Sequence, residues 1–576
     1  MRARGGACLG HRGATREGWG QGRGLGQASA LIMRGGRSGR GLRSGERLSW
    51  RPRAIGKEEA ADCMLCTSIT AEDMEGSLKQ IEAAMCVGVD IVELRLDYLK
   101  AEELDVEGLV GACRERNLRC IATYRPEWEG GRYAGGEEER LSALVEAAKA
   151  GANYVDLEYK LGEERLLGLR SEVSQVSGCK VIVSDHNYEV TPSSSELRGL
   201  IGSMKSCGAD VTKIATTATC TKDAFRMLQL AREESGEGNQ TIALAMGEMG
   251  LPSRLLAPKY GAFLTFGALT AGRESAPGQP SLADMMQVYR LKSQRSDTEV
   301  FGVIGDPIKH SMSPVIHNAA FDSVGSNAVY LPFLVTDVED FITTFKEYDL
   351  SGCSITIPHK EQVEKYCGEV DQVASKIGAI NTIVSQREAN GEGEATLKAS
   401  NTDWVAAISA IEEGMGGPGS LKGKEVCILG SGGTARALAF GALERGAGQV
   451  TIANRTLSKA ETLAKELGCL AKSLEDLEGD KSITGSVLIN TTSVGMSGPN
   501  VDKAPVSAGV VARFDLVFDA IYNPLKTKLL GMAEEGGKTT VSGVEMFIGQ
   551  AAEQFKQFTG AEPPLDLMRE KVMERL

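Results

Sequence analysis

Five ionisable side chains lie within or at the end of apolar, strand-like stretches in the first half of this sequence. Glu93 and Arg95 occur in "IVELRLD" (91–97), Arg125 ends "RCIATYR" (119–125), His186 lies near the end of "KVIVSDHN" (180–187), and Lys213 lies in the middle of "DVTKIAT" (210–216). Burial of an ammonium group is costly unless the group is paired or loses its proton. Lys213 is therefore expected either to have a partner or to lose its proton, and its position in an apolar stretch needs a functional reason.

Eight such stretches alternate with amphipathic segments between residues 62 and 292. The other four are 63–70, 154–159, 241–247 and 262–269. Eight alternating β and α units predict an α/β fold with a (β/α)8 barrel, and an open doubly wound sheet is the alternative. The carboxyl ends of barrel strands form the mouth of the active site, so polar residues near several of these ends predict a catalytic site there.

The second half contains a Gly-rich turn between two strand-like stretches. In "KEVCILGSGGTARALAFGALERGAGQVTIANRT" a strand, a turn with Gly430, Gly432 and Gly433, a helix and a second strand follow one another. This order predicts a Rossmann-like unit whose glycines let the backbone approach a pyrophosphate at the start of the helix. The second strand ends in Asn454 and Arg455 instead of an acidic residue, which favours NADP over NAD.

Charge is distributed unevenly along the chain. Its 576 residues carry a formal net charge of −13, yet residues 1–53 contain twelve Arg, two Glu, no Lys and no Asp, which leaves about −23 on the remainder. The acidic remainder argues against a nucleic-acid or anionic-membrane partner, and no apolar run is long enough to predict a transmembrane helix. The basic start is typical of an organellar transit peptide; a disordered tail or a misassigned start codon are the alternatives.

The thirteen cysteines are scattered through apolar runs. Cys63 and Cys66 form a C-x-x-C pattern, but no second pair and no nearby His accompany it. The pattern therefore indicates reduced core cysteines in a protein that is not secreted, and no metal site is expected.

Longer motifs resemble two enzyme families. Residues 62–292 are similar to type I 3-dehydroquinate dehydratase in "VELRLD", "TYRPEWEGG", "SDHNY", "VTKIA" and "ESAPGQP". Residues 298–576 are similar to shikimate dehydrogenase in "KHSMSP", "TIPHK", "NTDW" and "FIGQAAEQ". The combined order resembles the bifunctional plant-type enzyme of the shikimate pathway, which implies residence in the plastid for a chain with a basic leader.

The resemblance also implies the arrangement of domains. Residues 1–61 form the leader, and residues 62–292 form the dehydratase barrel. A two-lobed α/β dehydrogenase follows, with a substrate-binding lobe over 298–405, a Rossmann-like NADP lobe over 406–545, and C-terminal helices over 546–576 that return to the substrate lobe.

In the first half, the resemblance implies Schiff-base dehydration of 3-dehydroquinate to 3-dehydroshikimate. Lys213 would form an imine with the C3 ketone, and burial near other cations would lower its pKa and make the amine nucleophilic. His186 would be the general base, and Glu129 would be its partner. The residues implied to bind or orient the substrate are Glu93, Arg95, Arg125, Arg254, Ser275 and Gln279, of which the last two belong to a lid loop.

In the second half, the resemblance implies NADPH-dependent reduction of 3-dehydroshikimate to shikimate. Lys360 and Asp403 would handle the proton that accompanies hydride transfer. The implied substrate contacts are Ser311, Ser313, Thr356, Asn381, Tyr522 and Gln550, and the implied cofactor contacts are Gly430, Ser431, Gly432, Gly433, Thr434, Ala435, Asn454, Arg455, Thr456, Thr492 and Met546. Ala406 departs from the family, which usually has Gly there, and a methyl group could shift the helix slightly.

Two other hypotheses remain open at this point. The second half could oxidise quinate with NAD, although the Ser311–Ser313 pair and Thr356 favour shikimate. The chain could also be a non-catalytic sensor of pathway intermediates, although such a protein would not need Lys213 and Lys360. We expect a monomer whose partners are small-molecule substrates and NADP(H), with no nucleic-acid or membrane partner.

Overall fold

The computed structural model describes residues 63–576 except 177, 271, 273, 387–394 and 482, so the predicted leader lies outside the described residues. Within the described part, no helix is both long and apolar enough to cross a membrane.

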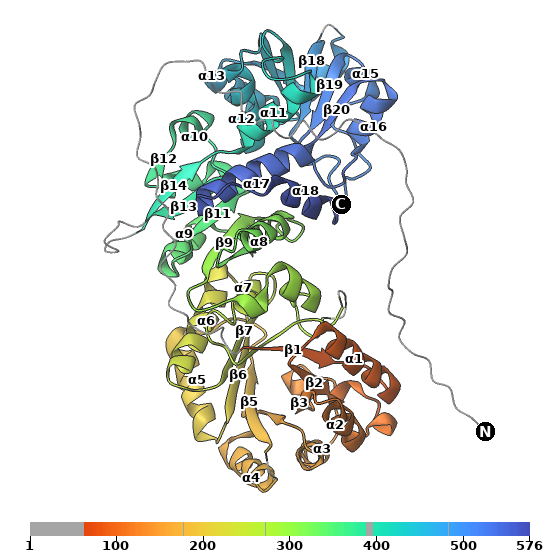
Figure 1. Cartoon of the computed structure of the whole chain (residues 1–576), viewed down its shortest axis with the longest axis vertical. Coiled ribbons are helices and arrows are strands. Elements are labelled where there is room, and N and C mark those ends of the chain that lie inside the picture. The colour runs from red at the N-terminus through yellow and green to blue at the C-terminus, as the bar shows by residue number, and fades with distance from the viewer. Residues whose placement is uncertain (1–62, 177, 271, 273, 387–394, 482) are drawn as a thin grey trace, which may run out of the picture. The chain divides into compact units, whose positions relative to one another are not determined.

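The first part of the structure is a nearly closed barrel of eight parallel strands in the order β7-β6-β5-β4-β3-β2-β1-β8 (Figure 1). The backbone N–H of Phe263 donates to the carbonyl of Thr241 at 3.0 Å, which brings β8 and β7 together where both begin. Each strand lies at a stretch that the sequence predicted, and the (β/α)8 prediction is confirmed. The strands are β1 Met64–Ile69, β2 Ile91–Arg95, β3 Arg119–Thr123, β4 Tyr154–Glu158, β5 Lys180–His186, β6 Val211–Thr217, β7 Thr241–Met246 and β8 Leu264–Phe266.

Helices cover the outside of the barrel. Local sequence signals set their ends: Asp73 caps the first helix by accepting a hydrogen bond from Gly76 N, and Gly88 ends it in the left-handed conformation that glycine tolerates. The helices are α1 Met74–Val87, α2 Val106–Glu115, α3 Glu137–Ala150, α4 Glu163–Ser174, α5 Ser194–Ser206, α6 Thr221–Gly236 and α7 Leu251–Leu255. After β8 a short π-helical turn, Asp284–Val288, follows instead of an α-helix.

The substrate lobe contains a mixed sheet of six strands in the order β10-β9-β11-β13-β14-β12, in which β13 runs antiparallel to both of its neighbours. Its strands are β9 Glu299–Gly305, β10 Ala328–Leu334, β11 Gly352–Ile355, β12 Glu369–Val370, β13 Thr382–Gln386 and β14 Thr396–Ser400. Its helices are α8 Ser313–Ser323, α9 Val338–Glu347 and α10 Gln372–Ile377, and the C-terminal helices α17 Gly543–Thr559 and α18 Leu565–Met573 pack on the same core as α8.

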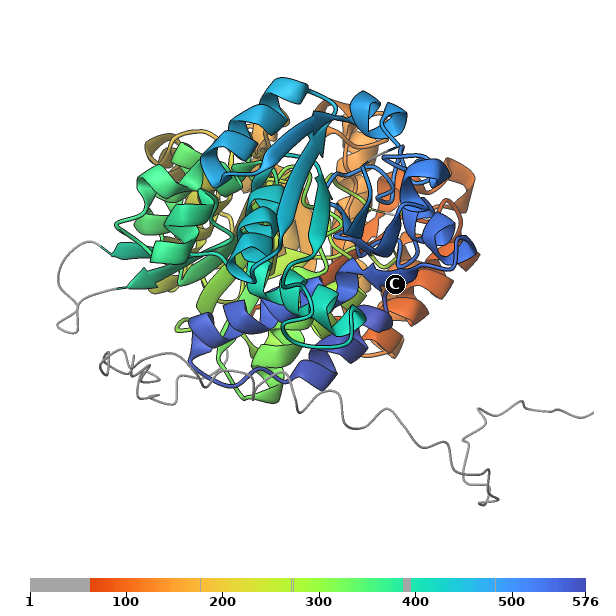
Figure 2. The same cartoon turned by 90° about the horizontal axis from the view of Figure 1, so that it is seen from above.

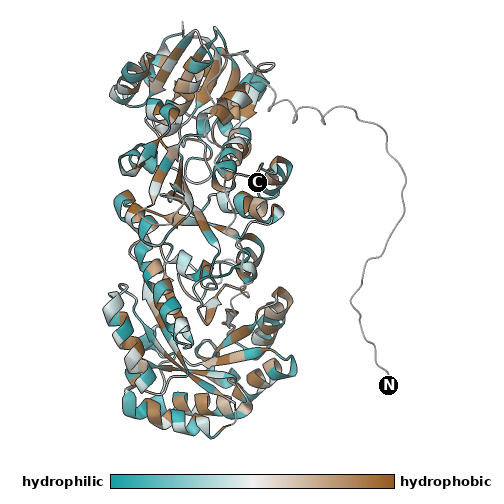
Figure 3. Ribbon diagram, turned by 60° about the vertical axis from the view of Figure 1, so that its left-hand side comes forward, coloured by the Kyte–Doolittle hydropathy of each residue, from teal (hydrophilic) through white to brown (hydrophobic). Residues whose placement is uncertain are grey.

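The cofactor lobe contains six parallel strands in the order β17-β16-β15-β18-β19-β20, the doubly wound order of a Rossmann fold. Alternate residues of β15 lie in different apolar clusters, Val426 with α11–α13 and Cys427 with α14–α16, so the sheet is buried on both faces (Figures 2 and 3). The elements are α11 Asp403–Gly414, β15 Glu425–Leu429, α12 Gly433–Glu444, β16 Gln449–Asn454, α13 Leu457–Leu467, β17 Leu470–Ser473, α14 Leu474–Gly479, β18 Gly485–Asn490, α15 Ala508–Val511, β19 Phe514–Asp519, α16 Lys528–Glu535 and β20 Thr539–Ser542.

Candidate active sites

On several strands, an apolar residue inside the barrel is followed by a polar or charged one. Val211 belongs to the apolar cluster inside the barrel, and Lys213 follows two residues later on the same face of β6 because side chains alternate along a strand. Ile91 and Ile182 belong to the same cluster and are followed in the same way by Glu93 and Ser184. Lys213 is the third of the seven residues of β6, so it lies within the strand, where the sequence placed it.

Lys213 is paired with two carboxylates. Its Nζ lies 2.8 Å from Asp156 Oδ2 and 3.3 Å from Glu93 Oε1, and the residue is 5% exposed. Burial lowers the pKa of Lys213, but the nearby carboxylates outweigh burial and the net pKa is raised. The prediction of a lowered pKa is therefore wrong for the enzyme without substrate, because the sequence did not reveal Asp156.

The carboxylates of Glu93 and Asp156 also form hydrogen bonds and an ion pair with residues other than Lys213. Ser68 and Thr123 donate to Glu93 at 2.6 and 3.0 Å, and although burial raises the pKa of Glu93, Lys213 and other partners lower it to about 2. Arg125 donates to Asp156 at 2.7 Å. Both carboxylates therefore remain ionised against Lys213.

Arg125 forms ion pairs with two buried carboxylates. Besides Asp156 it binds Glu158 Oε1 at 2.7 Å, and Glu158 Oε2 also pairs with Arg140 at 2.8 Å. Arg95 makes two hydrogen bonds to Asp97, at 2.9 and 2.7 Å. Two of the three predicted substrate arginines, Arg95 and Arg125, are thus in internal ion pairs, and their contact with substrate remains a prediction.

His186 lies at the end of β5 and contacts Glu129, which belongs to the loop after β3. Glu129 Oε1 accepts the backbone N–H of His186 at 2.9 Å and lies 3.3 Å from Nδ1. A proton on Nδ1 satisfies this contact and leaves the lone pair on Nε2. Burial, together with Arg125, lowers the pKa of His186 to about 4 despite Glu129, so the imidazole is neutral near pH 7.

Arg254 differs from the other buried arginines of the barrel. It lies on α7 and is 2% exposed, and no described residue forms an ion pair or hydrogen bond with its guanidinium. Burial alone lowers its pKa to about 10. A buried arginine without an anion is a ready partner for a ligand carboxylate.

The lid residues connect to the lysine cluster. Gln279 Oε1 accepts hydrogen bonds from Ser275 N and Oγ at 2.9 and 3.2 Å, and Ser275 Oγ donates to Ser68 Oγ at 3.1 Å. Since Ser68 donates in turn to Glu93, the loop is joined to the carboxylates around Lys213.

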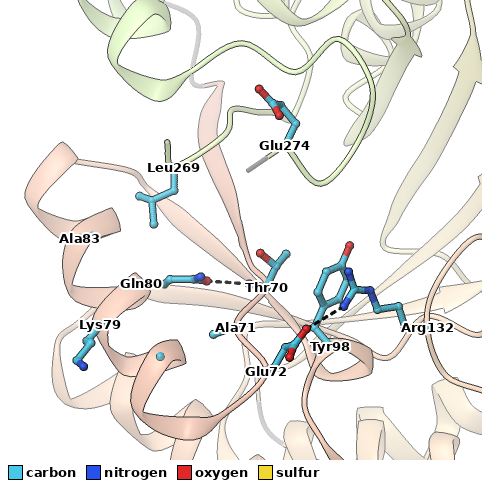
Figure 4. A pocket seen from close by; sticks show the side chains of 11 residues that line it. Thr70, Ala71, Glu72, Lys79, Gln80, Ala83, Tyr98, Arg132, Leu269 and Glu274 are labelled. Carbon is cyan, nitrogen blue, oxygen red and sulfur yellow. Dashed lines mark hydrogen bonds and ion pairs between the residues drawn. The ribbon is translucent and has the colours of Figure 1, made fainter. Parts of the chain in front are cut away.

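A separate, open cavity of about 600 Å³ lies beside the barrel mouth (Figure 4). Several of its polar groups already have partners: Arg132 pairs with Glu72 at 3.5 Å, and Gln80 accepts the backbone N–H of Thr70 at 2.8 Å. None of the residues predicted for catalysis lines it, so its size does not make it the reaction site.

Lys360 and Asp403 form a buried ion pair in the dehydrogenase half. Asn381 Nδ2 donates to the other oxygen of Asp403 at 3.0 Å and to Thr402 Oγ1 at 2.9 Å, which fixes the carboxylate at the start of α11. The predicted catalytic pair is thus brought together by residues 43 positions apart.

The predicted substrate contacts of this half lie on several elements. Ser313 begins α8, and its N–H donates to Ser311 Oγ at 3.3 Å. Tyr522 stacks on Phe547 of α17 with ring centroids 4.2 Å apart. Thr356 follows β11, and Gln550 of α17 accepts a hydrogen bond from Thr402 through its backbone carbonyl.

The Gly-rich turn fits a dinucleotide. Gly430 has a φ of +111°, and Gly432 caps α12, whose first residue is Gly433. A Cβ at Gly433 would lie 2.9 Å from Lys360 Cβ, so the glycine lets the turn lie directly against the predicted catalytic lysine. Ser431 completes the turn, and Thr434 and Ala435 lie in the first turn of α12.

The second strand of this unit presents free polar groups. Asn454 Nδ2 donates to the backbone carbonyl of Thr456 at 3.0 Å, while Arg455 and Thr456 are exposed and Arg455 forms no ion pair with a described residue. Thr492 Oγ1 donates to Asn490, and Met546 is buried on α17. The arrangement leaves a cation available for a 2′-phosphate.

The chain is similar to a bifunctional enzyme over most of its length. Over 514 residues, it is 43% identical to the bifunctional 3-dehydroquinate dehydratase/shikimate dehydrogenase, chloroplastic, of Arabidopsis thaliana, a match that covers 88% of this chain and 83% of that protein. This chain belongs to that bifunctional family.

Family models match both halves of this bifunctional family member. They are type I 3-dehydroquinase over residues 65–296, shikimate dehydrogenase substrate binding domain over 303–383, shikimate/quinate 5-dehydrogenase over 414–521, and shikimate 5′-dehydrogenase C-terminal domain over 543–573. The second half is also 39% identical over 285 residues to the shikimate dehydrogenase (NADP(+)) of Caldanaerobacter subterraneus subsp. tengcongensis, covering 48% of this chain and 97% of that protein.

A solved structure of shikimate 5-dehydrogenase from Thermus thermophilus, in complex with NADP(H) and shikimate, is similar to the second half. The sequence identity is 32%, the TM-score is 0.42, and the match covers 48% of this chain and all of that chain.

Sequence reasoning missed a buried hydrogen-bond chain behind Asp403. Gln554 accepts from Ser354 at 2.8 Å and donates to Thr382 at 3.0 Å, and Thr382 donates to Asn381 at 2.8 Å. Gln554 lies one helical turn after Gln550, and that spacing was the available signal.

Ala406, where the family usually has glycine, faces a glycine on α17. A methyl group built at Gly549 would lie 3.0 Å from Ala406 Cβ, so α11 and α17 approach closely here with one methyl group between them. The glycine on α17 leaves room for the alanine on α11.

Proposed function

We propose that this chain catalyses two consecutive steps: dehydration of 3-dehydroquinate to 3-dehydroshikimate in the barrel, and NADPH-dependent reduction of 3-dehydroshikimate to shikimate in the two-lobed half. The observation that carries the proposal is a pair of buried lysines, each held by a carboxylate in a half that matches the corresponding family. We place the barrel at residues 62–292, the substrate lobe at 298–405 and the cofactor lobe at 406–545, with the helices of 546–576 returning to the substrate lobe.

In the barrel, Lys213 attacks the C3 ketone of the substrate. Only the neutral amine is nucleophilic, so the ammonium, which Asp156 and Glu93 stabilise, must first release a proton. Loss of water from the resulting carbinolamine gives an iminium ion, which acidifies the C2–H bond. The hydroxyl of the carbinolamine takes up a proton again when it leaves as water.

His186 then removes the C2 proton through Nε2 and returns it to the departing C1 hydroxyl, which leaves as water. Glu129 balances the imidazolium that forms between these two transfers. Arg254 binds the substrate carboxylate, because it is a buried cation without an anion of its own. Hydrolysis of the product imine frees Lys213.

In the second half, Lys360 donates a proton to the C3 oxygen of 3-dehydroshikimate as that carbon is reduced, and Asp403 positions its ammonium. Ser311 and Ser313 bind the carboxylate. NADPH, when bound, supplies the hydride. The Gly430–Gly433 turn and α12 would hold its pyrophosphate, and Arg455 its 2′-phosphate.

Borohydride trapping tests the first half. Incubation with 3-dehydroquinate and borohydride should add the mass of the reduced adduct to the peptide that contains Lys213. Equal labelling of the Lys213→Met variant would exclude the imine.

A second variant tests whether the two sites are separate. Lys360→Ala should leave dehydration unchanged and lower the reduction of 3-dehydroshikimate by orders of magnitude. A parallel loss of both activities would contradict the two-site proposal. Oxidation of shikimate and of quinate should be assayed with NADP and with NAD. Comparable turnover of quinate with NAD would support the quinate alternative, and its absence would exclude that alternative.

The proposal extends to a plastid location and to a monomer with small-molecule partners only. The support is the similarity to a chloroplastic relative, the twelve arginines in the first 53 residues and the acidic remainder. A fluorescent fusion of residues 1–61 and light scattering of the purified chain test these two points.

A further inference from the structure

Lys160 extends from outside the barrel to the carboxylate that contacts the catalytic imidazole. It lies in the 3-10 turn Tyr159–Leu161, directly after β4, and half of its side chain is exposed. Its Nζ nevertheless lies 2.7 Å from Oε2 of Glu129, whose side chain is completely buried. An exposed cation is therefore the partner of a buried anion.

The two oxygens of Glu129 have different partners. Oε1 accepts the backbone N–H of His186 at 2.9 Å and faces Nδ1 of the same residue at 3.3 Å, while Oε2 accepts Lys160. A carboxylate held through both oxygens has a fixed plane, and this plane fixes the imidazole ring. Lys160 thus binds the carboxylate oxygen of Glu129 that His186 does not contact, and helps to fix the orientation of the carboxylate.

We propose that Lys160 is a positioning residue of the dehydration step, which keeps Glu129 ionised and oriented so that Glu129 can hold His186 in its reactive tautomer. The inference rests on the proposed role of His186 as the base. Lys160 acts through Glu129 and needs no contact with the substrate.

Lys160 also affects the pKa of Glu129. Burial raises the pKa of Glu129, whereas the hydrogen bonds from His186 and Lys160 lower it below its usual range. Loss of Lys160 removes one of these opposing contributions, so the pKa of Glu129 rises and the carboxylate takes up a proton at a higher pH.

Other charged groups face these residues and remain in place when Lys160 is replaced. Burial, Arg125 and Lys213 lower the pKa of His186, while Glu129 and Asp156 raise it. Asp185 lies 3.9 Å from Lys160, and burial together with Glu129 raises the pKa of Asp185. Tyr188 donates its hydroxyl to the backbone carbonyl of Glu129 at 3.0 Å, so the loop keeps this anchor.

The test is the pH dependence of dehydration by the full chain. We expect Lys160→Met to lower kcat roughly tenfold at neutral pH, the loss of one hydrogen bond to a charged group, with KM changed less than about twofold. The acidic limb of kcat/KM should move up by about one pH unit, because Glu129 becomes protonated more easily. Lys160→Arg keeps both charge and donor and should restore the profile.

A matched control is Lys205→Met, which removes another partly exposed lysine paired with a glutamate, here on the outer helix α5. It should leave kcat, KM and the pH profile unchanged. An unshifted acidic limb in Lys160→Met, or a failure of Lys160→Arg to restore it, would overturn the proposal.

A spectroscopic readout separates this proposal from the role of His186. The imidazole resonances of His186, assigned by their absence from His186→Ala, should titrate differently in Lys160→Met and like wild type in Lys205→Met. If dehydration persists in His186→Ala, His186 is not the base, and both its proposed role and this inference are contradicted. If His186→Ala loses dehydration but the kinetics and pH profile of Lys160→Met equal those of the wild type, only this inference is contradicted.

Discussion

Nζ of Lys213 lies 2.8 Å from Oδ2 of Asp156, and both side chains are almost fully removed from solvent. The other oxygen of Asp156 accepts hydrogen bonds from Arg125 and Ser184, at 2.7 and 2.6 Å, so the carboxylate has no freedom to turn away. The amine that we propose as the nucleophile is therefore an ammonium ion in the free enzyme. The proposed imine formation requires that Lys213 first release a proton.

Asp156→Asn should lower the pKa of Lys213. Asp156 raises the pKa of Lys213, whereas burial and Arg125 lower it. When Asp156 is replaced, less of this lowering is compensated, and the pKa of Lys213 falls. Labelling of Lys213 by acetic anhydride, followed by peptide mass, should then reach half its maximum at a pH at least about one unit lower. Asp210→Asn, which removes a carboxylate paired with Arg170 outside the barrel, is the control.

An unchanged labelling profile in Asp156→Asn would show that the pair does not set the protonation of Lys213. The variant also leaves Arg125 with one buried carboxylate instead of two, at a cost of about 3–5 kcal/mol, so labelling must be done well below its melting temperature.

Arg254→Met should weaken substrate binding and stabilise the fold. The buried guanidinium has no anion among the described residues, so KM for 3-dehydroquinate should rise about a hundredfold when the substrate carboxylate loses it. Removal of an unpaired buried charge should raise the melting temperature without ligand. Arg232→Met, at an exposed arginine of the same barrel, should change neither. A lower melting temperature together with normal KM would assign Arg254 a structural role.

The strands and the main candidate catalytic residues of the barrel could be predicted because their signals are local. An apolar run of six or seven residues with one lysine or histidine is unusual, and side-chain alternation places that residue inside the barrel. Lys213 and His186 were found in this way. Their order along neighbouring strands then follows from the parallel register of β5 and β6.

The partners of these residues could not be predicted in the same way. Asp156 and Glu158 lie in "YVDLEY", an alternating pattern that an ordinary half-exposed strand would also show. Their burial depends on the barrel, which brings Asp156 to a lysine 57 residues away. The direction of the Lys213 pKa shift depends on this contact, and for that reason the prediction from the sequence had the wrong sign.

Arg455→Ala should change the choice of cofactor in the dehydrogenase half. Arg455 is exposed after β16 and forms no ion pair with a described residue, so its charge is available to a 2′-phosphate. Loss of a charge-assisted hydrogen bond should raise KM for NADPH about tenfold to a hundredfold and leave KM for NADH unchanged. Lys459→Ala, an exposed lysine in the following helix, is the control. An equal rise for both cofactors would contradict the assignment.

Asp519→Asn should remove a pH-dependent loss of stability in the cofactor lobe. Burial raises the pKa of Asp519 to about 6 despite hydrogen bonds from Thr527, Ile521 and Asn490. The folded state therefore binds the proton more tightly than the unfolded state, whose pKa is near 3.8, and stability falls as the pH rises through this window, by about 3 kcal/mol in total.

Urea unfolding read by pulse proteolysis of the cofactor lobe tests this sign. The stability gained by Asp519→Asn over wild type should increase between about pH 4.5 and about pH 7.5, because only the wild type must ionise a buried carboxyl group. Asp515→Asn, an exposed position on the same strand β19, should show no such increase. A gain that is equal at both pH values would mean that the buried carboxyl of Asp519 does not titrate in this range, and that its three hydrogen bonds outweigh its burial.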